Sequence, residues 1–254
     1  MPLDALYSAA TGMLAQQTSL DNISNNLANV NTAGFKRGRA SFADLLYTEL
    51  TPQQASKQGN QVGLGVKIGS IQTQQEQGNL QSTGQALDLA IEGDGFFEVT
   101  QGNGTKGYTR AGSFSTDASG SMVTATGERL SPPIVIPQDA TDTAIGADGK
   151  VTAKVNGTLK TLGQIRIATF PNQLGLSSLG DNLFGVTADS GAATLKTPGQ
   201  KGVGALRSGE LEMSNVNAVD EMVGMITTQR SYEAVAKVVT ASDEMLQVAN
   251  QLRR

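Results

Sequence analysis

The chain has 254 residues, of which 38% are hydrophobic and 4% aromatic, and it contains no Cys, His or Trp. These absences exclude a Ser-His-Asp triad, a cysteine nucleophile and zinc sites built from Cys or His. With 19 basic against 23 acidic residues the net charge is -4, so the chain lacks the basic character typical of nucleic-acid-binding domains.

Residues 3–34 favour an amphipathic helix. Apolar residues recur at spacings of three and four through residue 20, and after one skipped step the pattern resumes at Ile23. Gly34 is expected to follow the last helical turn as its C-terminal cap. The apolar positions form a stripe of coiled-coil type, here called the N-terminal seam, which consists of Leu6, Ala10, Met13, Leu20, Ile23, Leu27 and Val30.

The polar face of this first helix is nearly uncharged. Residues 1–35 contain only Asp4 and Asp21 as charged side chains and are otherwise rich in Asn, Gln, Ser and Thr. Amides both donate and accept hydrogen bonds, which suits a surface where identical copies pack side by side. Because Asn, Ser, Thr and Gly also lower helix propensity, we expect a helix that is marginal until something packs on it. The alternative is a terminal helical hairpin of an ordinary globular domain.

Residues 217–254 favour a second helix, about 50 Å long. Asn217 is a candidate N-cap, and Asp220 and Glu221 are favourable charges in the first turn. From position 225 onward apolar or small residues again alternate by three and four. The C-terminal seam formed in this way includes Met225, Tyr232, Val235, Val239, Leu246 and Ala249.

The sequence between the helices favours β-structure. Residues 38–50 are expected to form a short helix, residues 51–61 a loop and residues 62–68 an extended segment. From 79 to 208 short apolar runs alternate with turn sequences such as Asn-Gly and Asp-Gly, which indicates a compact barrel or sandwich.

The predicted fold class is therefore α+β, with N- and C-terminal helices pairing as a coiled-coil-like domain and an all-β domain inserted between them. The expected segments are 1–35 for the N-terminal helix, 36–78 for a short helix and an extended linker, 79–208 for the β-rich domain and 209–254 for the C-terminal helix.

Candidate chemical motifs are few. Residues 102–107 match G-x-G-x-x-G, but strand-like runs on both sides favour a hairpin loop over a dinucleotide site. Glu92, Asp94 and Glu98 cluster among glycines, and paired carboxylates can serve acid-base chemistry, although nothing in their spacing demands it. We expect no catalytic residues, no metal ligands and no cofactor.

The sequence also bears on membranes and secretion. No apolar run approaches the roughly 20 residues that a membrane-spanning helix needs, so we do not expect insertion into a membrane. The N-terminus lacks a basic stretch followed by an apolar one, so a cleaved Sec signal is not expected.

Several stretches resemble, in order, the signatures of the bacterial flagellar rod and hook protein family. Residues 24–37 resemble the N-terminal signature, residues 87–97 and 108–114 the central one, and residues 214–217 and 225–233 the C-terminal one. The residues that carry the first two signatures are Asn25, Asn26, Leu27, Asn29, Gly34, Phe35, Asp88, Gly93, Gly95, Phe96 and Phe97.

Within this family, the chain length and residues 42–47 are most similar to the distal rod. Hook proteins are usually larger, and because residues 51–65 are short and Gln-rich, a proximal rod paralogue stays open as an alternative. A different class of function is a hydrolase that acts on the cell wall through Glu92 and Asp94.

The resemblance implies a non-enzymatic structural subunit of the flagellar basal body. Such subunits self-assemble into a helical tube, with the paired helices inside and the β-domain outside, which transmits torque and conducts exported subunits. The implied partners are copies of this chain, other rod proteins, the hook protein, surrounding ring proteins and the flagellar type III export apparatus, but not nucleic acid. The implied location is the basal body where it spans the periplasm.

Overall fold

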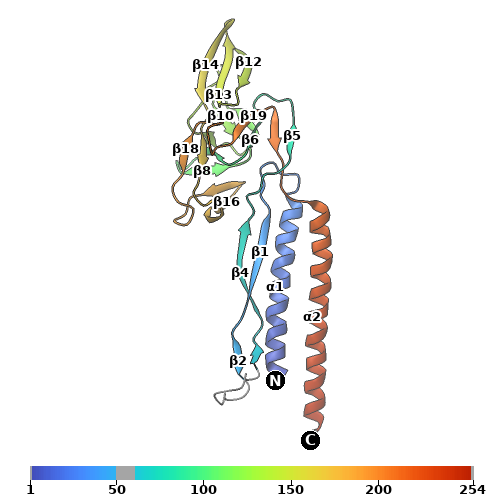
Figure 1. The fold of residues 1–254 in the computed structure, drawn as a ribbon. Helices are drawn as coiled ribbons and strands as arrows, with labels where there is room; N and C mark the ends of the chain where they lie inside the picture. Colours follow the sequence, from blue (N-terminus) through green and yellow to red (C-terminus); the bar gives the residue numbers. More distant parts are fainter. Residues whose placement is uncertain (1, 50–60, 253–254) are drawn as a thin grey trace. The chain divides into compact units, whose positions relative to one another are not determined.

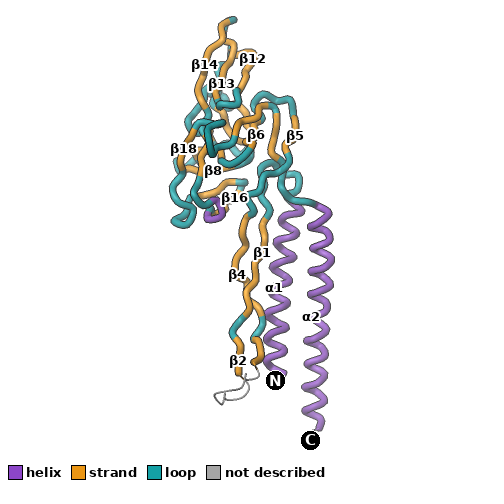
Figure 2. Tube along the Cα trace, viewed as in Figure 1, coloured by secondary structure: helices purple, strands orange, loops and turns teal. Residues whose placement is uncertain are grey.

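The computed structural model describes residues 2–49 and 61–252, and the chain divides into two compact units. Unit 1 contains residues 1–28, 38–73 and 217–254, and unit 2 contains residues 29–37 and 74–216. Both α-helices belong to unit 1, whereas unit 2 is built from strands, loops and a short 3-10 turn (Figures 1 and 2). The predicted α+β class, with terminal helices and a central all-β region, is confirmed.

The two terminal helices are α1 (Pro2–Ala28) and α2 (Ala218–Leu252), and they pack side by side within unit 1 (Figure 1). Asn217 caps α2 as predicted. Its side-chain Oδ1 accepts a hydrogen bond from the Val219 N–H at 3.0 Å, and its carbonyl accepts one from the Glu221 N–H at 3.0 Å. This cap satisfies N–H groups that the first helical turn cannot pair internally.

The first helix is shorter than predicted, because α1 ends at Ala28 and not near Gly34. Two turns follow it, in which the Thr32 N–H bonds the Asn29 carbonyl at 3.1 Å and the Phe35 N–H bonds the Thr32 carbonyl at 3.3 Å. The Thr32 hydroxyl also donates to the Asn29 amide oxygen. Short polar side chains compete for local hydrogen bonds in this way and favour turns over helix.

The expected short helix over residues 38–50 is wrong. β1 (Gly38–Asp44) instead pairs antiparallel with β4 (Val66–Thr73), and β2 (Tyr47–Glu49) pairs with β3 (Gln61–Gly63). Phe42 lies opposite Ile68 in this ribbon. The extended segment expected at 62–68 is confirmed by β3 and β4, and the loop expected at 51–61 lies, except for its last residue, outside the described residues.

Unit 2 contains one large sheet in the order β16-β17-β8-β7-β11-β10-β9, with β15 pairing with both β7 and β18. A three-stranded meander runs β12-β13-β14, and two further pairs join β19 to β6 and β20 to β5. The strands are β5 (Leu80–Ser82), β6 (Leu89–Glu92), β7 (Phe96–Thr100), β8 (Lys106–Thr109), β9 (Phe114–Thr116), β10 (Met122–Thr124), β11 (Arg129–Leu130), β12 (Ala140–Ile145), β13 (Lys150–Val155), β14 (Thr158–Gln164), β15 (Ile167–Thr169), β16 (Ser177–Gly180), β17 (Leu183–Gly185), β18 (Thr194–Lys196), β19 (Ala205–Ser208) and β20 (Glu210–Glu212).

The hydrophobic core of unit 2 forms two clusters. In the smaller one, Phe96 meets Phe170 and Phe184 edge to face, with ring centroids 5.7 and 5.8 Å apart. The larger cluster contains Leu89, Ile91, Phe97, Phe114, Met122, Leu130, Ile134, Ile136, Ile145, Val151, Ile165, Ile167 and Leu206. Residues 101–105 form the hairpin loop between β7 and β8, where the Gln101 N–H bonds the Thr105 carbonyl at 2.9 Å. The hairpin predicted at residues 102–107 is confirmed, although Lys106 and Gly107 already belong to β8.

Candidate functional site

The face of α2 that packs against α1 coincides with most of the C-terminal seam. Met225, Val235, Val239 and Leu246 are half-buried, whereas Tyr232 is 44% exposed. The side chain of Ala249 lies outside the described residues. The two helices approach each other closely at two glycines. A Cβ built on Gly12 of α1 would lie 3.8 Å from Val235 Cγ1, and one built on Gly224 of α2 would lie 3.5 Å from Ile23 Cδ1.

The N-terminal seam is buried less completely than its spacing predicts. Leu6, Met13, Leu20, Ile23 and Leu27 are half-buried, and Ala10 is exposed. Val30 is half-buried but follows the end of α1 and belongs to unit 2.

Unit 1 has little apolar core of its own. Its buried residues, within the described part of the chain, are small or polar: Ala9, Ala15, Asn26, Glu221, Thr228 and Ser242. Every larger apolar side chain whose burial is described there is half-buried or exposed. Helices of low propensity depend on tertiary packing for their stability. Unit 1 supplies little apolar packing of this kind within one chain.

α2 carries a second apolar patch in its first turns, here called the outer face, which consists of Val219, Met222, Val223 and Ile226. These side chains are between 52% and 67% exposed. At about 100° of rotation per residue they lie on the side of the helix away from the half-buried seam. A helix with apolar residues on both sides is typical of a helix that packs on two partners, and α1 occupies one side only.

Asn26 holds unit 1 together at the start of β1. Its Oδ1 accepts from the Gly38 N–H at 2.9 Å, and its Nδ2 donates to the Gly38 carbonyl at 2.9 Å and to Glu221 Oε2 at 3.4 Å. One buried amide therefore joins α1, β1 and α2. The helical pattern of the sequence places Asn26 on the polar face and so gives no sign of this burial.

The other signature residues have structural positions. Gly34 has a φ of +72°, and a Cβ there would lie 2.3 Å from the Ala111 nitrogen, while a Cβ on Gly95 would lie 2.0 Å from Ile167 Cγ2. Both positions therefore require glycine. Among the other signature residues, Phe96 and Phe97 are fully buried, Phe35 is half-buried and Asn25 is exposed. The remaining three accept hydrogen bonds: the Asn29 side chain from Thr32, the Asp88 carboxylate from Thr83 Oγ1 at 2.6 Å, and the Gly93 carbonyl from Arg110.

A buried charge cluster in unit 2 was not foreseen from the sequence. The Glu212 carboxylate bonds Lys36 Nζ with one oxygen and Arg110 with the other, at 3.3 Å, and the three side chains are at most 2% exposed. Arg110 also lies over the Phe96 ring, with its Cζ atom 5.3 Å from the ring centroid, and donates to the Gly93 carbonyl at 2.8 Å. Burial lowers the pKa of Lys36 and of Arg110, and the Glu212 charge opposes that shift.

The carboxylates near Gly93 are not brought together as a catalytic pair. Glu92 is exposed and pairs with Arg207 at 2.8 Å, and this hydrogen bond lowers the pKa of Glu92. Glu98 is buried and accepts from Ser131 Oγ at 2.8 Å and from Lys106 Nζ at 2.9 Å. Asp94 acts electrostatically on Arg110. A glycosidase acid needs a raised pKa, so the shift on Glu92 has the opposite sign.

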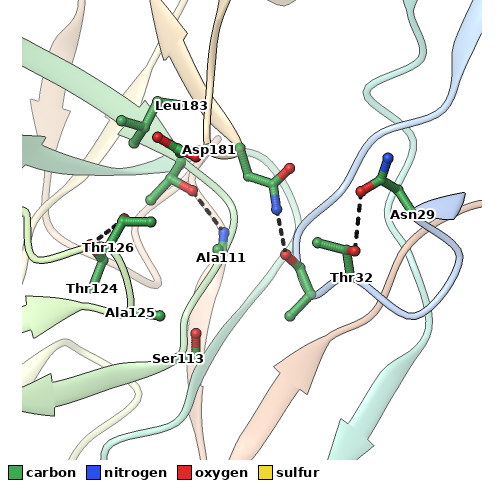
Figure 3. Close-up of a pocket in the computed structure, with 12 residues that line it drawn as sticks. Asn29, Thr32, Ala111, Ser113, Thr124, Ala125, Thr126, Asp181 and Leu183 are labelled. Carbon is green, nitrogen blue, oxygen red and sulfur yellow. Dashed lines mark hydrogen bonds between the residues drawn. The ribbon is translucent and has the colours of Figure 1, made fainter. Parts of the chain in front are cut away.

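Unit 2 contains a cavity of about 420 Å³ whose lining is rich in hydroxyl and amide groups (Figure 3). Thr32, Ser113 and Thr124 face it, and Asn182 donates from Nδ2 to the Ala33 carbonyl at 3.2 Å. Asp181 contributes the one carboxylate of the described lining. Hydrolysis of a glycosidic bond uses two carboxyl groups, so this cavity does not supply that chemistry.

Tyr108 gives unit 2 a measurable dependence on pH. Burial, followed by the charge and hydrogen bond of Glu98, raises the pKa of Tyr108 from 10.0 to about 12. The neutral phenol is favoured in the folded state, so its contribution to stability is fully present below pH 10 and is lost as the pH rises through about 12. We expect Tyr108→Phe to remove a tyrosine ionisation step near pH 12 from an absorbance titration; loss of a step near pH 10 instead would contradict this assignment.

Within residues 2–49 and 61–252, no group of three or more Asp, Glu, His or Cys side chains is placed to hold a metal ion. Neither α1 nor α2 has an apolar stretch that could cross a bilayer.

Comparisons with known proteins agree with these features. Three family models match: a flagella basal body rod protein model over residues 6–36, the D1 domain model of flagellar hook proteins FlgE/F/G over residues 90–153, and the C-terminal model of flagellar basal body rod FlgEFG proteins over residues 207–252. Together they cover both helices and part of the β-unit.

Similar proteins cover the whole chain. The flagellar basal-body rod protein FlgG of Caulobacter vibrioides is 49% identical over 99% of this chain and 100% of its own length. The FlgG proteins of Borreliella burgdorferi, 46% identical over 98% of both chains, and Bacillus subtilis, 44% identical over 99% of this chain and 100% of that one, are also similar. The chain therefore belongs to the FlgG family of flagellar basal-body rod proteins, and it is a structural subunit of the rod in the flagellar basal body.

Proposed function

We propose that this subunit polymerises into the helical tube of the rod by burying the outer face of α2, together with the incompletely buried seams, against copies of itself. The observation that carries the proposal is the composition of the interior of unit 1, where the buried side chains are small or polar and the larger apolar ones are half-buried or exposed. Apolar surface gains about 25 cal/mol per Å² when it is removed from water, so neighbours would supply the stability that one chain lacks.

The placement of the outer face is compatible with an open polymer. The seam of α2 faces α1 of the same chain, which leaves the outer face on the opposite side of the helix for a neighbouring copy. If that copy binds through a different surface, the contact is heterologous, and heterologous contacts extend into a filament when they do not close into a ring. The uncharged amides along α1 are compatible with the approach of identical helices, because no like charges are brought together.

The role that follows is mechanical. We propose that the tube transmits torque and conducts exported subunits, with the paired helices inside and unit 2 outside. The similarity of residues 42–47 and the full-length relatives named FlgG favour the distal rod over a proximal paralogue. Partners would be copies of this chain, other rod proteins, the hook protein and the surrounding rings, in the periplasmic part of the basal body, which the chain would reach through the flagellar type III export apparatus without a cleaved Sec signal.

We further propose that the subunit is not an enzyme. Glu92 is held by Arg207, Glu98 is buried among donors, and the cavity lining contains a single described carboxylate. Arg207 lowers the pKa of Glu92, which is the opposite of the raised pKa that a general acid needs.

Hydrogen exchange on the purified chain tests the assembly proposal. In the dilute monomer we expect weak protection across α1 and α2 and strong protection across the core strands of unit 2, since local stability follows buried apolar contact. Polymer collected by sedimentation should gain protection in both helices. Strong protection of the helices in the dilute monomer, with no gain on sedimentation, would contradict the proposal.

A further inference from the structure

Three segments that are distant in the sequence meet inside unit 2, close to the points where the chain passes between the units. They are residues 29–37, 74–79 and 210–216, and the division between the units falls at 37/38, 73/74 and 216/217. Each segment contributes to one hydrogen-bond network, which lies wholly within unit 2. The network is built around two side chains of the third segment, Asn215 and Glu212.

Asn215 joins all three segments through one amide. Its Oδ1 accepts from the Arg37 N–H at 2.8 Å, and its Nδ2 donates to the Gln74 carbonyl at 3.0 Å and to the Glu76 carbonyl at 3.1 Å. The first two segments are also bonded directly, because the Gln74 N–H donates to the Arg37 carbonyl at 2.8 Å. A side chain with one acceptor and two donors is needed at this position, which neither Asp nor Ser provides.

Glu212 joins the same segments a second time. Its Oε1 accepts from Lys36 Nζ and from the Gly78 N–H at 2.9 Å, and its backbone carbonyl accepts from the Gly34 N–H at 2.8 Å. Lys36 extends the link by donating to the Glu76 carbonyl at 2.7 Å. The other carboxylate oxygen, through Arg110, reaches the core strands.

The backbones approach each other closely at the same place. A Cβ built on Gly78 would lie 1.9 Å from the Met213 carbonyl oxygen, and the Met213 N–H donates to the Asn79 carbonyl at 2.9 Å. Only glycine allows this approach, so the second and third segments are in direct contact and are not bridged by side chains alone.

We infer that Asn215 and Glu212 form a clasp that makes these three segments one cooperative body, so that a displacement of any one of them is resisted by all three. The physical reason is that two side chains bond backbone groups of all three segments, so losing either side chain removes several of these bonds at once. Both residues are positioning residues for unit 2. The inference concerns the single chain and does not depend on polymerisation.

The test is hydrogen exchange on the dilute, full-length chain carrying Asn215→Ala. We expect exchange to quicken by at least about tenfold in all three segments together, because the lost amide leaves groups of each segment unpaired. Exchange in β7 and β8 should stay unchanged. An effect confined to residues 210–216, or no effect, would overturn the clasp.

Two further variants keep the test decisive. Asn103→Ala is the matched control, because Asn103 accepts only from residue 105 of its own turn, and its effect should be confined to that turn. If Asn215→Ala proves unfolded, Asn215→Asp keeps an acceptor for Arg37 but loses both donors to the second segment. It should still quicken exchange in all three segments together, because they form one body. An effect confined to residues 74–79, or no effect, would overturn the inference. A failure of the assembly proposal would appear in sedimentation and not in these exchange rates, so the two proposals are tested separately.

Discussion

Val223→Asp is expected to abolish polymerisation while the isolated chain stays folded. Val223 belongs to the outer face of α2 and is 56% exposed, so a carboxylate there remains hydrated in the monomer. In the polymer the same group would be buried without a partner, which costs at least about 3 kcal/mol, or roughly a hundredfold in the association constant of each contact. Because every subunit repeats the contact, the lowest protein concentration at which polymer forms should rise far above that of the unmodified chain. Sedimentation and electron microscopy of negatively stained samples measure this directly.

The control for that experiment is Gln229→Asp, which adds the same charge at an exposed polar position of the same helix. It should polymerise like the unmodified chain. Val239→Asp, in the half-buried face toward α1, provides a contrast, because it should weaken helix pairing already in the monomer as well as assembly. Normal filaments from Val223→Asp would show that the outer face is not a contact.

The long helices could be predicted because their signals are local and repeated. The Asn217 cap, the acidic first turn and the sustained spacing of α2 all lie within one segment, and local signals of this length are rarely overridden. Within residues 38–50, Phe42, Leu45, Leu46 and Leu50 recur at spacings that also fit a helix. Residues 38–44 form a strand because they pair with residues 66–73. A pairing between segments this far apart cannot be recognised from the local sequence pattern of either one.

The buried polar network could not be read from the sequence for a related reason. Lys36, Arg110 and Glu212 are far apart in the sequence, and each alone resembles an ordinary solvated charge. Only the fold brings them together. The glycines of the signatures were informative in a different way, since Gly34 and Gly95 occupy places where a Cβ would clash, and such requirements make a motif recognisable without showing what it contacts.

Glu212→Leu is expected to destabilise unit 2 by about 3–5 kcal/mol, because it leaves the Lys36 and Arg110 charges buried without their carboxylate. The variant also removes the acceptor of the Gly78 N–H and thereby loosens the second segment of the clasp. Urea unfolding followed by circular dichroism should show a lower midpoint with a similar slope, since the surface exposed on unfolding hardly changes.

Lys36→Met should be milder than Glu212→Leu, since the carboxylate keeps Arg110 and the Gly78 N–H, and the ranking of the two variants tests the charge argument more sharply than either value. Arg207→Met, which breaks the exposed pair with Glu92, is the control and should leave the midpoint unchanged, because exposed ion pairs contribute little. Equal midpoints for Glu212→Leu and the unmodified chain would mean that buried cations tolerate the loss of their counter-charge in this fold. That result would remove the electrostatic part of the clasp and leave the Asn215 amide as the link between its three segments.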